Sequence, residues 1–571
     1  MVLHRVLPIT LLLACVPPGE PAEPGEADDS GAPEDSGAPP ADADGDGIDA
    51  EDDCDDADPS VGEGTTWYPD ADADGYGGDA DALTLCPGER LPDGAWLSTG
   101  GDCDDSTAEA APGLEEICDD GLDNDCDGTS VGCRLDGAVG RDRADALVLT
   151  DPDHVDDPDG GDAVAIPFGA GEALPADIDG DGQLDLVVGA PFTGDAGALA
   201  VVRGPLSGTS YLSEASAAVS GDDANGWFGW ELAAGDLDGD GYPEVIGGAP
   251  ISGQILAFSG PVLGDLDAAD ASAVWTGEAL DRLSMAWSED LTGDGERDLL
   301  VGAPTAGDGS GGLAGAAWVI SGPPSGGALE DEALALWGQG DDRAGISVSP
   351  AGDVDGDGVA DALIGAWTAA SGEGYGAAYL VRGPLTDAMA LEDADRRWSN
   401  GPPGNTGEVV ANVGDLDGDG LPDVGLGLPS FSYSSSPLEK QGAVFVLSGV
   451  TPSTSRVQDS SFFTIYGTQG WDSAVGSSVS GGDLDGDGQG DLLLVAYLGY
   501  AQVRYGPVEG AVLDLLFTDL DQAVTVDSTV QSAFLADMDG DGTTDLYLSE
   551  STRWFASRTT HVGWLLSGTA W

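Results

Sequence analysis

An acidic loop of nine residues recurs seven times along the chain and limits the folds that the chain can adopt. The loop has the form DxDGDGxxD, with one variant, and its copies begin at Asp177, Asp236, Asp290, Asp353, Asp415, Asp483 and Asp537. Successive copies are 59, 54, 63, 62, 68 and 54 residues apart. A repeat of this regular length predicts an architecture built from copies of one supersecondary unit.

Short apolar segments accompany each copy of the loop. One follows it directly, as in LVVGAP (186–191), a second ends near a Gly turn, and others precede it, as in AVWTG (273–277) and LALWG (334–338). Apolar runs of this length bounded by Gly and Pro are typical of β-strands. About four strands in each of seven units predict an all-β fold, a seven-bladed β-propeller over residues 163–571. An open β-solenoid and separate sandwiches are the alternatives.

Each loop carries oxygen ligands suited to Ca²⁺. Acidic residues at positions 1, 3, 5 and 9 and the carbonyl of position 7 converge on one point, and Gly at positions 4 and 6 lets the backbone turn around an ion. Position 2 is apolar in every copy and is expected to fix the loop to the core. Mg²⁺ is disfavoured because it prefers fewer protein ligands, and the other alternative is a set of acidic turns without ions. The candidate ligands in chain order are Asp177, Asp179, Asp181, Gln183, Asp185, Asp236, Asp238, Asp240, Tyr242, Glu244, Asp290, Thr292, Asp294, Glu296, Asp298, Asp353, Asp355, Asp357, Val359, Asp361, Asp415, Asp417, Asp419, Leu421, Asp423, Asp483, Asp485, Asp487, Gln489, Asp491, Asp537, Asp539, Asp541, Thr543 and Asp545.

The loops differ from one another at two ligand positions. Thr292 replaces an acid at position 3 of the third loop, and Glu244 stands at position 9 of the second. Since a hydroxyl is a weaker ligand for Ca²⁺ than a carboxylate, we expect the third site to be the weakest.

The second unit shows the full pattern of a known repeat. Phe228-Gly229, the loop from Asp236 to Glu244 and Gly248-Ala249-Pro250 together resemble the FG-GAP repeats of the integrin α-subunit head, a seven-bladed β-propeller. The resemblance covers roughly residues 163–571 and implies adhesion or ligand recognition on the face opposite the calcium loops. Other units depart from the pattern: Phe-Gly becomes Ala344-Gly345, Thr406-Gly407 and Val475-Gly476.

Residues 42–133 hold all but one of the cysteines and predict a small disulfide-rich module. The six are Cys54, Cys86, Cys103, Cys118, Cys126 and Cys133. An even, clustered set in an exported chain predicts disulfides, and closeness in sequence favours Cys86–Cys103 and Cys118–Cys126 among fifteen connectivities. A thiolate zinc site is the alternative, although the module contains no CxxC pair.

The same module contains acids at alternate positions. Asp42, Asp44, Asp46, the carbonyl of Ile48 and Asp53 match a calcium loop, and Asp70, Asp72 and Asp74, then Asp123, Asp125 and Asp127, repeat its start. These segments resemble the metal-binding repeats of MopE-type bacterial surface proteins, and the first also resembles thrombospondin type 3 calcium repeats. The resemblance implies metal binding, but copper is not supported because the module contains no His. A stapled acidic spacer without a tight site is the alternative.

The N-terminal residues predict export. Residues 1–15 pair a basic start with a short apolar run and resemble a signal peptide whose lipobox-like end would make Cys15 the site of a lipid anchor. Residues 16–41 predict a disordered acidic tether and 134–162 a connector. The expected location is a bacterial cell surface or outer membrane, or the medium if the protein is secreted.

The charge and composition exclude several functions. With 106 acidic against 17 basic residues the net charge is −89, which excludes nucleic-acid binding and limits membrane contact to a lipid anchor. Three His and one Lys leave little room for His-based or Schiff-base catalysis. We therefore expect a non-enzymatic calcium-binding protein that recognises a protein or glycan ligand. A carbohydrate-active or other hydrolase on a propeller scaffold, and a passive calcium-binding envelope spacer, are the alternatives.

Overall fold

The computed structural model describes most of residues 53–114 and 173–566. It also describes Ile48 before the first stretch, and Asn124, Cys126, Ala144 and two strands between the stretches. Several predicted features lie outside the described residues. They are the signal peptide, the tether, Cys15, Cys118, Cys133, Asp42, Asp44, Asp46, Asp123, Asp125, Asp127, Asp485, Asp487 and Asp541. The residues outside it are 1–47, 49–52, 56, 59, 79–81, 93, 109, 113, 115–123, 125, 127–136, 140–143, 145, 150–172, 192–195, 213–214, 223–225, 278–279, 281, 308–311, 370–375, 401–404, 433–440, 450–453, 468–473, 485–488, 497–499, 507, 509–512, 516–521, 526–528, 541–542, 552–560 and 567–571.

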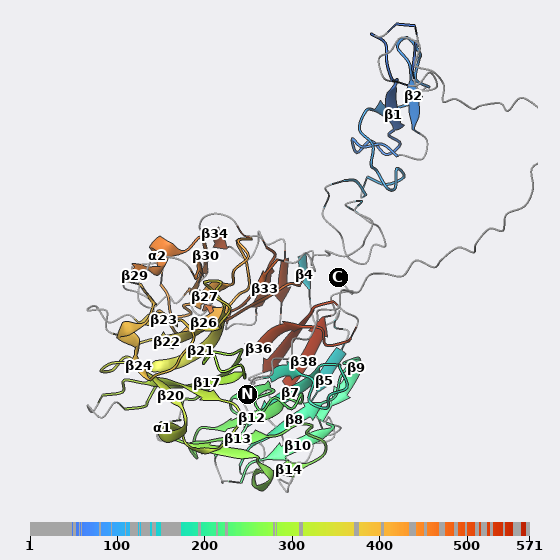
Figure 1. Ribbon diagram of the computed structural model, residues 1–571. Coiled ribbons are helices and arrows are strands. Elements are labelled where there is room, and N and C mark those ends of the chain that lie inside the picture. The colour runs from blue at the N-terminus through green and yellow to red at the C-terminus, as the bar shows by residue number, and fades with distance from the viewer. Residues whose placement is uncertain are drawn as a thin grey trace, which may run out of the picture.

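The described part of the chain is all-β, with seven five-stranded sheets and one three-stranded sheet (Figure 1). In each large sheet four strands pair antiparallel and a fifth joins the outer edge in parallel. The first sheet contains β6 (Ala173–Ala176), β7 (Asp185–Ala190), β8 (Ala198–Val202), β10 (Ala217–Ser220) and β14 (Leu266–Asp267), and the second β11 (Leu232–Gly235), β12 (Glu244–Ala249), β13 (Gln254–Phe258), β15 (Ala273–Thr276) and β19 (Gly327–Ala328). The third contains β16 (Ser284–Ser288), β17 (Asp298–Ala303), β18 (Ala316–Ser321), β20 (Leu334–Trp337) and β24 (Met389–Ala390), and the fourth β21 (Ala344–Gly352), β22 (Asp361–Ala366), β23 (Ala377–Val381), β25 (Arg396–Ser399) and β29 (Thr454–Arg456). The fifth contains β26 (Val409–Asn412), β27 (Asp423–Gly427), β28 (Ala443–Ser448), β30 (Phe463–Gly467) and β34 (Leu513–Leu515).

The last two sheets combine strands from distant parts of the chain. The sixth contains β31 (Val475–Gly482), β32 (Asp491–Ala496), β33 (Tyr500–Arg504), β35 (Gln522–Thr525) and β4 (Gly137–Val139), and the seventh β36 (Thr529–Ala536), β37 (Asp545–Ser551), β38 (His561–Leu566), β5 (Ala146–Leu149) and β9 (Gly208–Tyr211). The segment expected to be a connector thus supplies β4 and β5, and β5 pairs antiparallel with β38. This pairing ties the start of the repeat region to its end.

The fifth strand of each sheet belongs to the next repeat. A short stretch such as β14 pairs with the preceding sheet, makes one helical turn and then enters the fourth strand of its own sheet. The turns are η5 (Ala268–Asp270), α1 (Leu329–Glu332), η6 (Leu391–Asp393) and α2 (Val457–Ser460). The added strand covers an edge that would otherwise expose unpaired backbone groups. The sequence predicted four strands per unit, so this fifth strand is an addition to that prediction.

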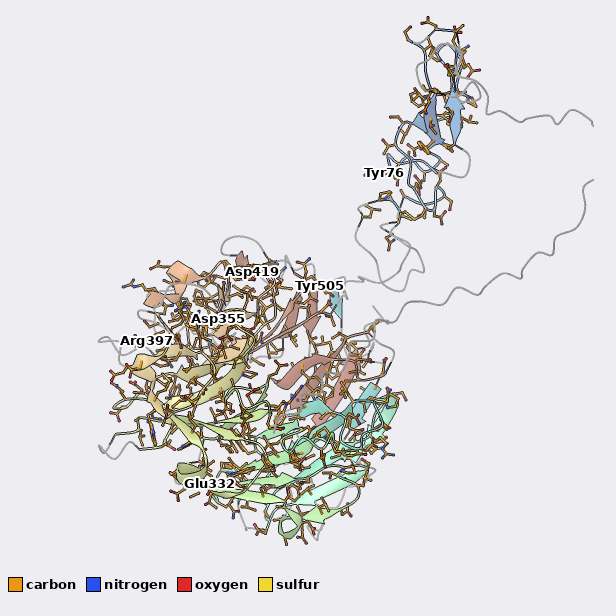
Figure 2. The ribbon with its side chains drawn as sticks, in the orientation of Figure 1. Tyr76, Glu332, Asp355, Arg397, Asp419 and Tyr505 are labelled. Carbon is orange, nitrogen blue, oxygen red and sulfur yellow. A yellow bond between two sulfur atoms is a disulfide. The ribbon has the colours of Figure 1, made fainter. Side chains whose placement is uncertain are left out.

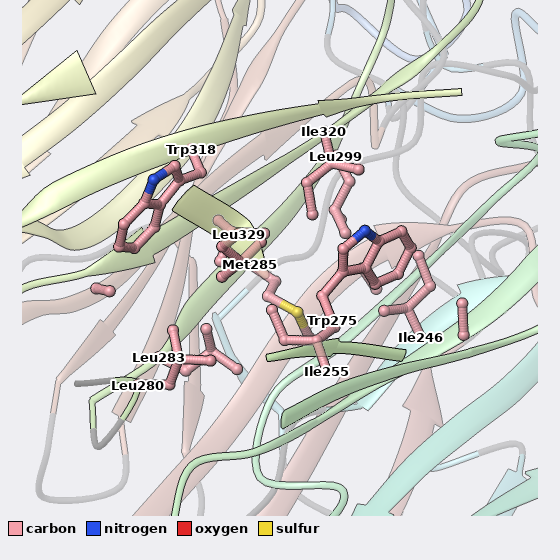
Figure 3. Packing of buried hydrophobic residues seen from close by; sticks show 14 of the residues in the cluster. Ile246, Ile255, Trp275, Leu280, Leu283, Met285, Leu299, Trp318, Ile320 and Leu329 are labelled. Atoms are coloured by element: carbon pink, nitrogen blue, oxygen red, sulfur yellow. The ribbon is translucent and has the colours of Figure 1, made fainter. Parts of the chain in front are cut away.

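Buried side chains fill the space between consecutive sheets. Figure 3 shows one such cluster, in which Ile246, Ile255 and Trp275 of the second sheet pack with Leu299 and Ile320 of the third. A comparable cluster joins the seventh sheet to the first through residues that include Val148, Leu186 and Tyr547. The first strands β6, β11, β16, β21, β26, β31 and β36 contact one another in that order, and β36 contacts β6. Six of them line a cavity of about 390 Å³.

The glycine of the Phe-Gly segment has a packing role between sheets. Gly229 and its counterparts Gly345, Gly407 and Gly476 have φ angles of 84°, 82°, 81° and 85°. A Cβ at Gly229 would clash with the carbonyl oxygen of Ala198 in the preceding sheet. Only Gly adopts this backbone without strain, which explains why the glycine is present where the phenylalanine is replaced.

The three-stranded sheet consists of β1 (Thr65–Pro69), β2 (Leu83–Leu85) and β3 (Trp96–Leu97), and two disulfides accompany it. They join Cys54 to Cys86 and Cys103 to Cys126. The expected pairs Cys86–Cys103 and Cys118–Cys126 were therefore wrong. Antiparallel pairing of β1 with β2 places Leu85 opposite Thr65 and so carries Cys86 back towards Cys54. Strand pairing, rather than distance along the chain, decides which cysteines meet.

Candidate metal centre

Each acidic loop connects the first and second strands of one large sheet. Its position 9 is the first residue of the second strand, as Asp185 is of β7 and Glu244 of β12. Position 2 is buried in all seven loops, as expected, with at most 3% exposure at Ile178, Leu237, Leu291, Val354, Leu416, Leu484 and Met538. These side chains fix each loop to the core, so the positions of its carboxylates are set by the sheet.

The carboxylate at position 1 organises the turn. In the first loop Asp177 Oδ1 accepts hydrogen bonds from the N–H groups of Gly180 and Asp181, and its Oδ2 accepts one from Gly182. Gly180 and Gly182 have φ angles of 75° and 89°. The same bonds recur in the fifth loop, from Gly418, Asp419 and Gly420 to Asp415. The glycines at positions 4 and 6 thus give the backbone the curvature that the sequence predicted.

The acid at position 9 is buried beneath each loop. One of its oxygens accepts the N–H of position 2, as Glu244 Oε2 does from Leu237 at 2.6 Å and Asp423 Oδ2 from Leu416 at 2.9 Å. Burial, and to a smaller extent the other acids of the loop, raise the pKa of Glu244 and that of Asp423 to about 7 each. The hydrogen bonds from position 2 lower both pKa values but do not offset the effect of burial. Burial likewise raises the pKa of Asp361 to about 6. The charged form of this residue is therefore poorly stabilised by the protein alone.

Two buried oxygens of the described position-9 acids have no hydrogen-bond partner. They are Glu244 Oε1 and Asp423 Oδ1. Three loops each bring three acids together so that their ligand oxygens lie within 4.8 Å of one another. The groups are Asp177, Asp179 and Asp185 in the first loop, Asp236, Asp238 and Glu244 in the second, and Asp353, Asp355 and Asp357 in the fourth. A divalent cation would satisfy the unpartnered oxygens and offset the repulsion, so these residues fit a metal ion bound through oxygen.

An arginine lies against position 3 in two loops. Arg203 forms an ion pair with Asp179 of the first loop, and Arg382 Nη1 lies 2.7 Å from Asp355 Oδ2 of the fourth, labelled in Figure 2. The residue after each arginine donates its N–H to position 9, from Gly204 to Asp185 and from Gly383 to Asp361. Our sequence reading did not assign these arginines to the loops. The shared Arg-Gly-Pro at the end of the third strand is the signal that could have found them.

Neighbouring loops contact one another along one edge of the sheets. A Cβ at Gly180 of the first loop would clash with the Tyr242 ring of the second, and one at Gly540 of the seventh with Gln183 of the first. The Met538 carbonyl in the seventh loop accepts a hydrogen bond from Leu206 N–H in the first unit at 2.8 Å. Because each loop supports the next, disorder in one loop would be transmitted to its neighbour.

The third loop lets us test the expected weakness of its site. Thr292 donates its N–H to Asp298 Oδ2 at 2.9 Å, and its hydroxyl lies 3.5 Å from Asp298 Oδ1. We predict that Thr292→Asp raises the calcium affinity of this loop about tenfold or more, since it supplies the missing carboxylate. Calorimetric titration of the full chain measures this, with Thr305→Asp outside the loops as the control. An unchanged titration of Thr292→Asp would show that position 3 is not a ligand.

Comparison with known proteins identifies the repeat. The family descriptions "FG-GAP-like repeat" and "FG-GAP repeat" match residues 176–247 and residues 228–276 and 283–320. The chain therefore contains FG-GAP repeats. The description "Putative metal-binding motif", of the MopE type, matches residues 53–72 and 102–130. The FG-GAP matches cover the first three acidic loops, and the metal-binding motif covers parts of the disulfide-bonded region.

The FG-GAP region is similar to integrin α chains. It is 31% identical to integrin alpha-7 of Mus musculus over 192 residues, which is 32% of this chain and 16% of that protein, and 30% identical to integrin alpha-4 of Xenopus laevis over 153 residues, 26% and 14% of the two chains. It is also 34% identical to the phosphatidylinositol-glycan-specific phospholipase D of Homo sapiens over 154 residues, 24% and 18%. The matches thus span less than a fifth of the relatives' length.

A solved structure titled BBS1N in complex with ARL6DN covers 72% of this chain and 94% of its own, with 10% identity and a TM-score of 0.37. A similarity this low adds nothing to the fold described above. Among the described residues, no helix has the length and apolar character needed to cross a membrane.

Proposed function

We propose that this protein is a non-enzymatic, exported, calcium-stabilised β-propeller that recognises a ligand through the face opposite its acidic loops. The observation that carries the proposal is the set of buried position-9 carboxylates, two of which have an oxygen without a partner. Carboxylate and carbonyl oxygens are the ligands that Ca²⁺ prefers, and the multidentate loop suits it better than Mg²⁺. Disulfides persist in oxidising compartments, which supports export.

The seven large sheets are interpreted as seven blades of one closed propeller. The pairing of β5 with β38, the contact of β36 with β6 and the buried cluster between the seventh and first sheets support closure. The cavity lined by the first strands is in the place expected for the central channel of such a ring. Chelation tests the calcium part of the proposal, as argued in the Discussion.

The opposite face carries an aromatic and cationic group that would suit a ligand. Trp367 follows β22, whose other end carries Asp361 of the fourth loop, so it lies at the end of the strand away from the acids. Arg282 and Arg343 place their guanidinium carbons 5.6 Å and 6.0 Å from the centre of its ring. In a chain with 17 basic residues, two arginines on one tryptophan favour a protein or glycan ligand with an anionic group.

This group supports a binding prediction. We expect Arg343→Gln combined with Trp367→Ala to reduce binding at least tenfold to any ligand found on arrays of matrix proteins and acidic glycans. Surface plasmon resonance with the full chain in calcium measures the change, and Arg456→Gln, at an exposed arginine that ends β29, is the control. Equal loss with the control, or arrays without any signal, would count against recognition through this face.

A further inference from the structure

Carboxylates from two separate loops meet in the disulfide-bonded region. Asp72 belongs to two groups whose ligand oxygens lie within 4.8 Å of one another, one with Asp70 and Asp74 and the other with Asp102 and Asp105. Asp72 and Asp74 follow β1, whereas Asp102 and Asp105 follow β3. The sequence pattern marked the first loop, but it gave no reason to place Asp102 and Asp105 beside it.

Backbone contacts hold the two loops together. Asp102 N–H donates to the Gly77 carbonyl at 3.3 Å, and Ala71 N–H donates to Asp105 Oδ1 at 2.7 Å. The Cys103–Cys126 disulfide begins at the residue after Asp102. The position of Asp102 relative to Asp72 is therefore fixed by the fold and does not depend on flexible side chains.

Three of these carboxylates use their oxygens in the same way. Asp72, Asp74 and Asp102 each accept a backbone N–H at Oδ1, from Asp74, Tyr76 and Asp104 at 3.2, 2.8 and 2.9 Å. The Oδ2 of each is buried and has no hydrogen-bond partner. Asp102 is only 5% exposed, so one of its oxygens is aimed into the group and cannot be satisfied by bulk water.

Buried, unpartnered oxygens of several acids are unfavourable unless a cation or protons compensate them. Burial, and secondarily the neighbouring acids, raise the pKa of Asp102 and of Asp72. The donor set consists of carboxylate oxygens without His or thiolate, which favours a hard cation over zinc or copper.

We propose that Asp72, Asp74, Asp102 and Asp105 bind one Ca²⁺ ion that joins the two loops. The site is distinct from those of the propeller loops and does not depend on them. It uses residues from both stretches matched as a metal-binding motif, Asp72 from the first and Asp102 and Asp105 from the second. The ion would connect the loop after β1 to the loop held by the Cys103–Cys126 disulfide.

Counting bound calcium tests this site. Full-length wild type, Asp102→Asn and Asp58→Asn are dialysed to equilibrium at a free Ca²⁺ concentration that just saturates the wild type. Asn at 102 keeps the acceptor for Asp104 N–H but removes the charge, whereas the Asp58 side chain is exposed and accepts hydrogen bonds from Ser60. We expect Asp102→Asn to bind one ion fewer per chain and Asp58→Asn to equal the wild type. An unchanged count for Asp102→Asn would overturn the proposal.

A second variant tests the site if Asp102→Asn does not fold correctly. If thiol titration finds more free cysteines in Asp102→Asn than in the wild type, the count is repeated with Asp74→Asn, two residues before Tyr76, which Figure 2 labels. One ion fewer supports the site, and an equal count overturns it. Since each variant is compared with the wild type, the result holds whether or not the propeller loops bind calcium, and Asp423→Asn reports on those loops separately.

Discussion

Removing calcium is expected to lower the melting temperature of the full chain by about 15 °C or more. One site held at 100 times its dissociation constant contributes about 2.7 kcal/mol, and several loops act on the same folded state. Because buried clusters join consecutive sheets and each loop contacts the next, we expect the loss of stability to affect all seven large sheets and not one alone. Differential scanning calorimetry in calcium and in excess EDTA measures the shift.

The control for chelation is replacement of the ion. Calcium added back in excess should restore the original transition, and Mg²⁺ at the same concentration should restore less than half of the shift, since the loops offer more protein ligands than Mg²⁺ usually takes. A shift of only a few degrees in EDTA would rule out calcium as a main source of stability.

Without calcium, stability is expected to fall as the pH rises from about 5 to 7.5. The pKa of Glu244 is raised from 4.5 to about 7, and those of Asp423 and Asp361 from 3.8 to about 7 and about 6. An acid whose pKa is higher in the folded state binds its proton more tightly there, so its stabilising contribution is present below the unfolded value and is lost as the pH passes through the folded value. Calcium should reverse the trend, because it binds the deprotonated carboxylates.

The general repulsion of a chain with net charge −89 acts in the same direction and must be separated. Melting curves in EDTA are therefore recorded at high salt, which screens exposed charges more than buried ones. The double variant Glu244→Gln and Asp423→Asn should flatten the pH dependence, whereas Asp265→Asn, at an exposed acid, should leave it unchanged. A slope as steep in the double variant as in the wild type would show that these two acids do not cause it.

Residue pattern alone was sufficient for the local structure of the loops. The pattern predicted the burial of position 2, the glycines with positive φ and the strand at the end of each loop. Each of these features follows from a short-range requirement of the backbone. It also identified the strands around Trp275 and Trp337 as part of each unit.

Features that depend on pairing between distant segments were not predictable. The fifth strands are as short as Gly327–Ala328 and have no apolar pattern of their own, since the neighbouring sheet defines them. Cys54 meets Cys86 only because β1 and β2 pair. Arg203 reaches Asp179, and Asp102 reaches Asp72, through tertiary placement that spacing along the chain does not encode.

The pairing of β5 with β38 has a consequence for biosynthesis. Leu149 lies opposite Val562, so the seventh sheet lacks its third strand until residues 561–566 have been synthesised. The first six repeats emerge while the strand they must close against has not been made. Until then the nascent chain cannot complete the arrangement of sheets that its paired ends define.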